Sequence, residues 1–173
     1  MVATSPLARS VLSGLAALAA TAGVSSAQLV TSQANTATGH IMVAPDAVKW
    51  QPLPREWTNG PPPPPGGKAP PEVAIIWGDP AKEGEPFLFR LRGSTAGATT
   101  PVPPHSHPTD ERITVLSGVF CMGMGDTYDP AACEDMQAGS YMVMPKGVHH
   151  FAVAKNSVIE VYGVGPFKIN WVK

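Results

Sequence analysis

Short runs of alternating hydrophobic and polar residues, separated by glycine and proline turns, fill the chain from Glu72 onward. The run FLFRLR places Phe87 and Phe89 on one face of a predicted strand and Arg90 and Arg92 on the other. We expect the aromatic face to lie in a core and the arginines to be solvated; the alternative is an inward arginine that binds a substrate carboxylate. No sustained helical period occurs in this region, so the pattern predicts an all-β sandwich or barrel.

The same alternation continues toward the C-terminus. In the last long strand it places Ile159 and Val161 inward and Glu160 and Tyr162 outward. Before it, the run RITVLSGVFCMGMGD predicts a long strand that ends in an acidic, proline-containing segment. We interpret that acidic segment as a solvated hairpin tip.

The N-terminal segment 1–27 differs in pattern from the rest. One cation, Arg9, precedes the apolar run VLSGLAALAATAGV, and the segment ends in the small residues Ser-Ser-Ala. This order is typical of a secretory signal peptide, and it predicts a periplasmic or secreted protein without a lipid anchor or a stable membrane anchor after cleavage. The alternative is a folded N-terminal helix, which Gly14 and Gly23 disfavour.

Segment 28–71 is predicted to be a flexible tether followed by a proline-rich arm. Its first part is rich in Thr, Ser, Gln and Asn and is too polar to offset the entropy of ordering. The apolar residues of 41–57 then favour an arm lying across the outside of the sheet. The proline run at 61–65 favours a stiff spacer, the alternative being a PxxP docking ligand.

Composition limits the classes of function. With 173 residues and 43% hydrophobic content, the chain can bury one core, which we place in a single barrel over 72–173. The net charge of −1 gives no electrostatic basis for binding nucleic acid or an anionic membrane surface. A small-molecule ligand remains as the expected partner.

Candidate chemistry is concentrated in the stretch PPHSHPTDERITVLSG. His105, His107 and Glu111 share the parity of one strand face, provided that the turn at Pro108 preserves the register. Imidazole nitrogen and carboxylate oxygen suit a divalent transition metal better than calcium or magnesium. Asp110 lies on the opposite face, where we expect it to cap the turn.

A fourth ligand is predicted from the downstream stretch GSYMVMPKGVHH. It contains a short strand, a Pro-Lys-Gly turn and then His149 and His150. Neighbours on a strand point to opposite faces, so only one of these histidines can enter the site easily.

These two stretches resemble the two motifs of the cupin superfamily. The first motif is matched by His105, His107, Glu111 and Gly118, and the second by Gly139, Pro145, Gly147 and His150. Thr99 replaces the leading glycine of the first motif, and Ala154 replaces the final asparagine of the second. The similarity covers roughly 41–173 and is greatest to small single-domain bacterial cupins of unassigned activity.

The resemblance implies a double-stranded β-helix, or jelly-roll barrel, with an extended N-terminal arm. It also implies a metal held by His105, His107, Glu111 and His150, with His149 pointing outward. Fe, Mn, Ni, Cu and Zn all remain candidates for the ion. Because single-domain cupins commonly pair, the resemblance implies a homodimer as well.

Cys121 and Cys133, the only cysteines, are predicted to form a disulfide in an oxidising compartment. The alternative is a pair of free thiols too far apart to join. Two methionine pairs with i, i+2 spacing are interpreted as core residues, with copper ligation as the alternative. They are Met122 with Met124 and Met142 with Met144.

The function we expect is that of a metal-dependent oxidoreductase, dioxygenase-like, acting on a small organic molecule. Three histidines and one glutamate leave one or two positions of a six-coordinate ion open. The same ligand set serves oxalate-degrading enzymes and sugar isomerases among cupins. A non-catalytic periplasmic binding module and a metal-dependent isomerase or lyase therefore remain alternatives. Catalytic residues are not identified; Asp110, Tyr141 and His149 are the neighbouring candidates for proton transfer.

Overall fold

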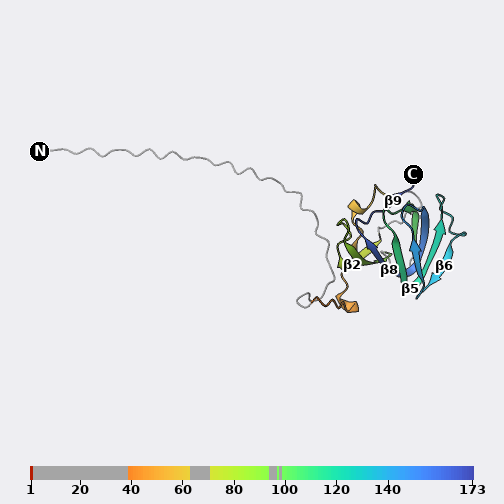
Figure 1. Ribbon diagram of the computed structural model, residues 1–173, viewed down its shortest axis with the longest axis horizontal. Helices are drawn as coiled ribbons and strands as arrows, with labels where there is room; N and C mark the ends of the chain where they lie inside the picture. The colour runs from red at the N-terminus through yellow and green to blue at the C-terminus, as the bar shows by residue number, and fades with distance from the viewer. Residues whose placement is uncertain (2–38, 63–70, 94–96, 98) are drawn as a thin grey trace.

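The computed structural model describes residues 1, 39–62, 71–93, 97 and 99–173 (Figure 1). The predicted signal peptide, apart from Met1, and most of the predicted tether lie outside these residues. Within the described part the chain is built from strands, with two short 3-10 helices, and no helix there is long and apolar enough to cross a membrane. The prediction of an all-β fold is confirmed.

Two 3-10 helices precede the main strands of the barrel. The 3-10 helices are η1 (Pro45–Ala47) and η2 (Arg55–Trp57). The strands are β1 (Gln51–Pro52), β2 (Glu72–Gly78), β3 (Pro86–Arg92), β4 (Thr99–Ser106), β5 (Glu111–Met124), β6 (Glu134–Gln137), β7 (Tyr141–Met144), β8 (His150–Val164) and β9 (Asn170–Trp171).

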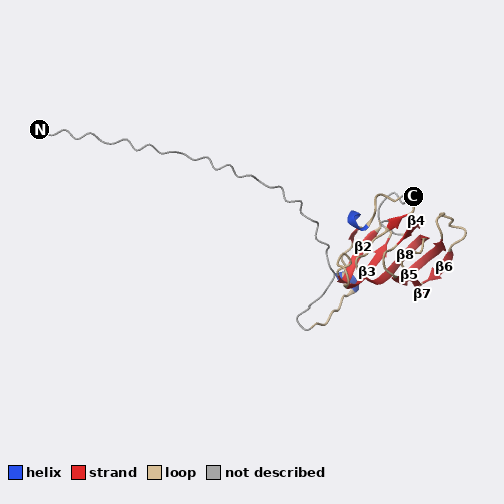
Figure 2. Ribbon diagram, turned by 45° about the horizontal axis from the view of Figure 1, so that its top comes forward, coloured by secondary structure: helices blue, strands red, loops and turns tan. Residues whose placement is uncertain are grey.

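The two longest strands, β5 and β8, organise the sheet. They pair antiparallel along most of their length, from Arg112 opposite Tyr162 to Met124 opposite His150. The first half of β8 also pairs with β4, and its second half pairs with β3. The sheet therefore curls into a barrel, as Figure 2 shows, and the architecture is that of a double-stranded β-helix.

The core lies inside this barrel and follows the predicted alternation. Phe87 and Phe89 are 1% and 0% exposed, and Val161 is fully buried, whereas Tyr162 is 41% exposed. The two phenylalanine rings stack with their centroids 5.2 Å apart, and Phe167 packs edge-on against Phe89 at 4.9 Å. Burial of these aromatic side chains is the main hydrophobic contribution from this end of the barrel.

The part of the arm nearest the barrel is integral to the fold. Trp57 is 1% exposed and packs against Phe89 and Phe167 at 5.4 and 5.3 Å. We call residues 51–62 the strap. The expectation that the apolar arm lies wholly outside the sheet is wrong at Trp57, because this ring completes the aromatic cluster. A boundary between arm and barrel at residue 72 stays a prediction.

Backbone hydrogen bonds fasten the strap to the C-terminal segment. The amide of Ile169 donates to the carbonyl of Trp57, and the amide of Asn59 donates to the carbonyl of Ile169. The indole Nε1 of Trp171 donates to the carbonyl of Gly60 at 3.0 Å. The strap therefore crosses the barrel at the level of β9.

The two arginines of β3 point outward, as expected. Arg90 pairs with Glu160 at 2.9 Å, and Arg92 pairs with Glu72 at 2.8 Å. The Arg92 guanidinium also lies 4.2 Å from the centroid of the Trp50 ring. Both cations are neutralised at the surface by carboxylates of neighbouring strands.

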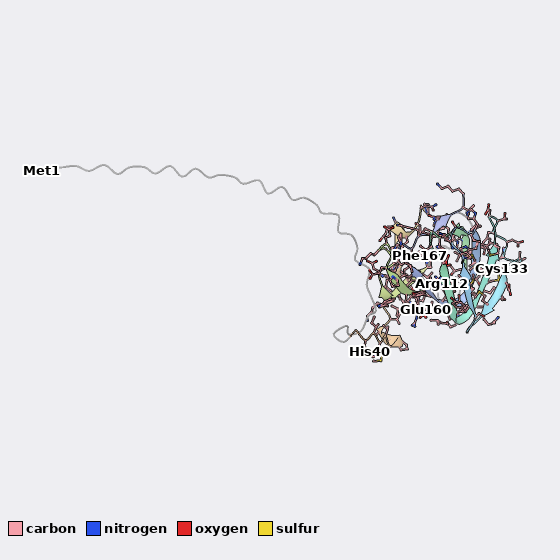
Figure 3. The ribbon with its side chains drawn as sticks, in the orientation of Figure 1. Met1, His40, Arg112, Cys133, Glu160 and Phe167 are labelled. Atoms are coloured by element: carbon pink, nitrogen blue, oxygen red, sulfur yellow. A yellow bond between two sulfur atoms is a disulfide. The ribbon has the colours of Figure 1, made fainter. Side chains whose placement is uncertain are left out.

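Cys121 and Cys133 are joined in a disulfide, so the structure forms the predicted pair. The bond connects β5 to the turn that precedes β6, whose residues pair with β5 from Val119 to Met122. In Figure 3 Cys133 lies at the edge of the barrel farthest from His40. The disulfide thus constrains the β5–β6 hairpin at the end opposite the arm.

Candidate metal centre

Three strand ends meet at one end of the barrel and bring together the four residues predicted as ligands. His105 lies in β4, His107 follows it directly, Glu111 begins β5, and His150 begins β8. All four are buried, with exposed fractions between 1% and 6%. The three histidines each offer a ring nitrogen within 4.8 Å of the others.

Backbone carbonyls fix the orientation of all three imidazoles. Nδ1 of His105 lies 2.7 Å from the carbonyl oxygen of Pro103, and Nδ1 of His107 lies 2.7 Å from that of Lys168. Nδ1 of His150 lies 3.0 Å from the carbonyl oxygen of Val148. A carbonyl oxygen can only accept, so each Nδ1 must carry the proton. Each neutral ring then presents the lone pair of Nε2, which is the arrangement that protein metal sites use to orient their histidines.

Glu111 joins the histidines through one carboxylate oxygen. Its Oε2 lies 3.3 Å from Nε2 of His107 and 3.8 Å from Nε2 of His150. Although Glu111 is this close, the buried Nε2 of His107 makes no hydrogen bond within the described residues. A buried ring nitrogen without a hydrogen bond, beside a buried carboxylate, fits a site that a cation would complete.

The electrostatics of the site favour an anionic Glu111 beside neutral His105 and His150. Burial lowers the pKa of His105 to about 3, with the neighbouring His150 and His107 adding to the shift. Burial also lowers the pKa of His150. Burial opposes ionisation of Glu111, but the charges of His107, His150 and His105 outweigh it and lower the pKa of Glu111 to about 2.

His107 behaves differently because it lies nearest the carboxylate. Burial lowers the pKa of His107, but the charge of Glu111 outweighs that effect, and the pKa is raised from its ordinary value. Before any cation is bound, the proton shared by this pair partly neutralises the buried charge. A divalent ion would replace that proton and leave His107 neutral.

Aromatic rings enclose the centre. Phe167 stacks on His107 with centroids 4.9 Å apart, and Trp171 packs edge-on against His105 at 5.4 Å. These contacts limit rotation of the histidine rings and cover them with apolar surface. Neither aromatic residue is predicted as part of the site from sequence, because no motif or spacing connects the last strand to the histidines.

The donor set fits a divalent transition metal. Three imidazole nitrogens and one carboxylate oxygen suit zinc, iron, manganese, nickel or copper, whereas calcium and magnesium favour sites made only of oxygen. His105, His107 and His150 form the one three-residue cluster of this kind within the described part of the chain. Assignment of Glu111 as the fourth ligand remains a proposal.

The other polar residues considered from sequence lie outside the centre. His149 is exposed, as expected, and its Nδ1 lies 2.6 Å from Oδ1 of Asp126. Asp110 accepts a hydrogen bond from the amide of Lys146, and Tyr141 is 60% exposed. None of these candidates for proton transfer lines the cavity described next.

A cavity of about 1080 Å³ opens onto the histidines. Inward-facing residues of the barrel strands form its sides, and residues of the strap and the C-terminal segment complete its wall. Met122 lines it, whereas Met124 is exposed, so the predicted pair on β5 is divided between the interior and the surface. Met144 of the other pair is buried. The strap's contribution has no sequence motif and is apparent only in the folded chain.

A double-stranded β-helix with histidines and a glutamate converging at one end of an internal cavity defines the class of cupin barrels. The family model described as Cupin matches residues 82–166. The chain belongs to the cupin superfamily, as its two motifs predict. Membership of a bacterial subgroup stays a prediction.

Curated relatives match over a short part of the chain. A germin-like protein, subfamily 1 member 1, from Arabidopsis thaliana is 39% identical over 56 residues, which are 32% of this chain and 26% of that protein. The putative germin-like protein 9-2 from Oryza sativa subsp. japonica is 40% identical over 50 residues, which are 28% of this chain and 23% of that protein. The match thus spans about a quarter of each relative.

Among solved structures, a putative ethanolamine utilization protein Q from Salmonella typhimurium LT2 superimposes with a TM-score of 0.51. The superposition covers 82% of this chain and 98% of that chain at 15% sequence identity. This likeness shows a shared fold.

Proposed function

We propose that this chain is an exported, metal-dependent oxidoreductase of the dioxygenase type that acts on a small organic molecule. One observation carries the proposal: three carbonyl-oriented imidazoles lie together at a large cavity, and Glu111 lies within 3.8 Å of Nε2 of two of them, His107 and His150. Two histidines and one carboxylate on one side of an ion are typical of non-haem iron oxygenases, and the third histidine is compatible with manganese or nickel.

In this proposal His105, His107, His150 and Glu111 hold the ion. When bound, the metal supplies open coordination positions and positive charge for substrate oxygen atoms. The chain's own residues orient the ligands, supply negative charge and exclude water. The carbonyls of Pro103, Lys168 and Val148 keep the rings oriented, Glu111 supplies one negative charge, and the apolar contacts of Phe167 and Trp171 exclude water from one side.

Export rests on the signal-peptide pattern of segment 1–27 and on the disulfide. A disulfide persists in oxidising compartments, which is compatible with a periplasmic or secreted protein. N-terminal sequencing of the protein from its native source tests this: cleavage after Ala27 is expected, and an intact Met1 in the cytosol would overturn the proposed localisation.

Elemental analysis of protein purified from its native compartment, followed by oxygen-uptake screening, tests the activity. We expect about one equivalent of a redox-active metal per chain and oxygen uptake with an oxygen-rich chelating substrate. Zinc alone, with no oxygen uptake, would overturn the oxidoreductase. That result would favour the second candidate, a binding module or isomerase, which the size of the cavity also accommodates.

A further inference from the structure

Two regions of the cavity wall, which lie at different positions along β8, differ in chemistry. One region holds the metal-binding residues, where His105 of β4 pairs with His150 of β8. Four residues further along β8, Ala154 pairs with Thr100, and both line the same cavity. At about 3.3 Å per residue, these four steps separate the two lining positions by about 13 Å along the strand.

Between these two regions the cavity is walled by apolar side chains. Residues of four strands face it: Leu91 of β3, Val102 of β4, Phe120 and Met122 of β5, and Ala152 and Ile159 of β8. Leu53 of the strap also lines it. Apart from the metal-binding residues, the ionisable residues in the described lining are Arg55 and Glu56 of the strap and Arg92, which is paired with Glu72. Beside the apolar side chains a polar ligand would lose its hydration without compensation.

The volume of the cavity and the charge of the metal site limit the class of ligand that can bind. The cavity, at about 1080 Å³, lies at the upper limit of the roughly 300–1,000 Å³ typical of small-molecule sites. A two-carbon diacid would occupy only the metal end and leave the apolar section empty of ligand. A divalent ion with Glu111 as its one anionic ligand keeps a net positive charge, which favours an anionic oxygen group beside it.

We propose that the ligand is an elongated amphiphile, with a chelating, oxygen-rich head at the histidines and an apolar tail that extends along the cavity toward Thr100 and Ala154. The proposal rests on the proposed function for the position of the head. The position of the tail rests on the cavity wall alone. The substrate class is thus an aliphatic or aryl-alkyl molecule with a metal-chelating end group, and short diacids are excluded as the preferred ligand.

A series of alkyl hydroxamic acids tests the proposal, because the head stays constant while the tail lengthens. Acetohydroxamic, hexanohydroxamic and decanohydroxamic acids are titrated by calorimetry into the full, disulfide-bonded chain loaded with zinc, which avoids oxidation. Each buried methylene strengthens binding up to roughly fourfold. We expect decanohydroxamate to bind at least tenfold more tightly than acetohydroxamate. Equal affinities along the series would overturn the proposal.

Substitutions at the far end locate the tail. Ala154→Leu fills the section opposite Thr100, so it should abolish the gain from hexanohydroxamate to decanohydroxamate and leave acetohydroxamate binding unchanged. Ala154→Val is the less bulky version if the leucine variant does not fold. Ala132→Leu, which adds the same bulk at an exposed turn, is the matched control and should behave as the unmodified chain. An undiminished gain in both Ala154 variants would overturn the assignment of the tail.

The metal-free chain separates this inference from the proposed function. Acetohydroxamate should bind only when zinc is present, since its affinity comes from the head. If acetohydroxamate never binds while the longer acids bind with or without zinc, the proposed metal function fails and the apolar site for the tail stands. If acetohydroxamate binds zinc-loaded protein and lengthening adds nothing, the metal site stands and the elongated ligand fails.

Discussion

The carboxylate of Asp110 accepts a hydrogen bond from the backbone amide of Lys146, with 3.0 Å between Oδ1 and N. This bond ties the turn before β5 to the turn after β7 and directs Asp110 away from the histidines. Its neighbour Glu111 consequently enters the buried site, where its Oε2 lies 3.3 Å from Nε2 of His107. Two adjacent acidic residues therefore have separate roles, which substitution can distinguish.

Glu111→Gln should weaken metal binding sharply and leave the fold intact, because it removes the anionic charge while keeping the shape of the side chain. Asp110→Asn is the matched control, since the amide oxygen of Asn can still accept from Lys146. Metal stoichiometry after dialysis, measured beside thermal unfolding, compares the two. An empty site in Asp110→Asn with a full site in Glu111→Gln would reverse the assignment.

His107→Ala should lose bound metal, with stoichiometry falling from about one toward zero, since three ligands remain and none of them replaces the lost nitrogen. His149→Ala is the control, because His149 is exposed and pairs with Asp126 instead. Equal metal loss in both variants would show that the exposed histidine also belongs to the site.

Acid should destabilise the metal-free chain. The pKa of His105 falls from 6.5 to about 3 in the folded protein, so the unfolded chain binds more protons between these values. Stability must then rise with pH across that window and be lost as the pH falls through it. The pKa of Glu111 is lowered to about 2, so further stability is lost as the pH falls below its ordinary pKa of 4.5. The lowered pKa of His150 acts in the same direction as that of His105. The raised pKa of His107 opposes them.

Denaturant unfolding at several pH values measures this dependence. We expect the free energy of unfolding to decrease by a few kcal/mol between about pH 6.5 and pH 4. His105→Asn should have a flatter profile than the unmodified chain. A profile that rises with acidification would mean that the His107–Glu111 pair dominates the site.

Trp57→Ala should cost about 3–5 kcal/mol of stability, because the indole is buried among Phe89 and Phe167. Trp50→Ala is a control in the same part of the chain. It removes a half-buried ring whose contact with the Arg92 guanidinium contributes about 0.5–1 kcal/mol. Chemical denaturation of both variants checks the difference, and similar small losses would place the strap outside the cooperative fold.

Reduction of the disulfide should lower stability by about 3 kcal/mol on the chain-entropy model, for a loop closed across a sequence separation of 12. Mass spectrometry of unreduced protein should show Cys121 and Cys133 joined. Bound metal should be unaffected, since the bond lies on the β5–β6 hairpin and not among the histidines. Two freely alkylated thiols in native protein would contradict the pairing.

Sequence reasoning succeeds here where local pattern and motif agree. Phe87 and Phe89 follow strict alternation, and strand parity places them in the core. Motif spacing selects His105, His107, Glu111 and His150, which the fold buries near one another although they come from separate strands; their role as metal ligands stays a prediction. Trp57, Phe167 and Trp171 are different, because they lie among prolines or in very short strands without period. Their positions depend on contacts between segments more than a hundred residues apart, such as the bond from Trp171 to Gly60, with a separation of 111.

Trp171 contacts both the strap and the histidines, through Nε1 to Gly60 and through its ring to His105. A shift of this indole therefore changes both the position of the strap at Gly60 and the orientation of the His105 ring. Binding linkage is reciprocal: if bound metal stabilises the packing of the strap against the barrel, the packed strap must raise metal affinity by the same factor. Cutting or removing the strap should therefore lower the affinity for metal, even though no residue of the strap is a proposed ligand.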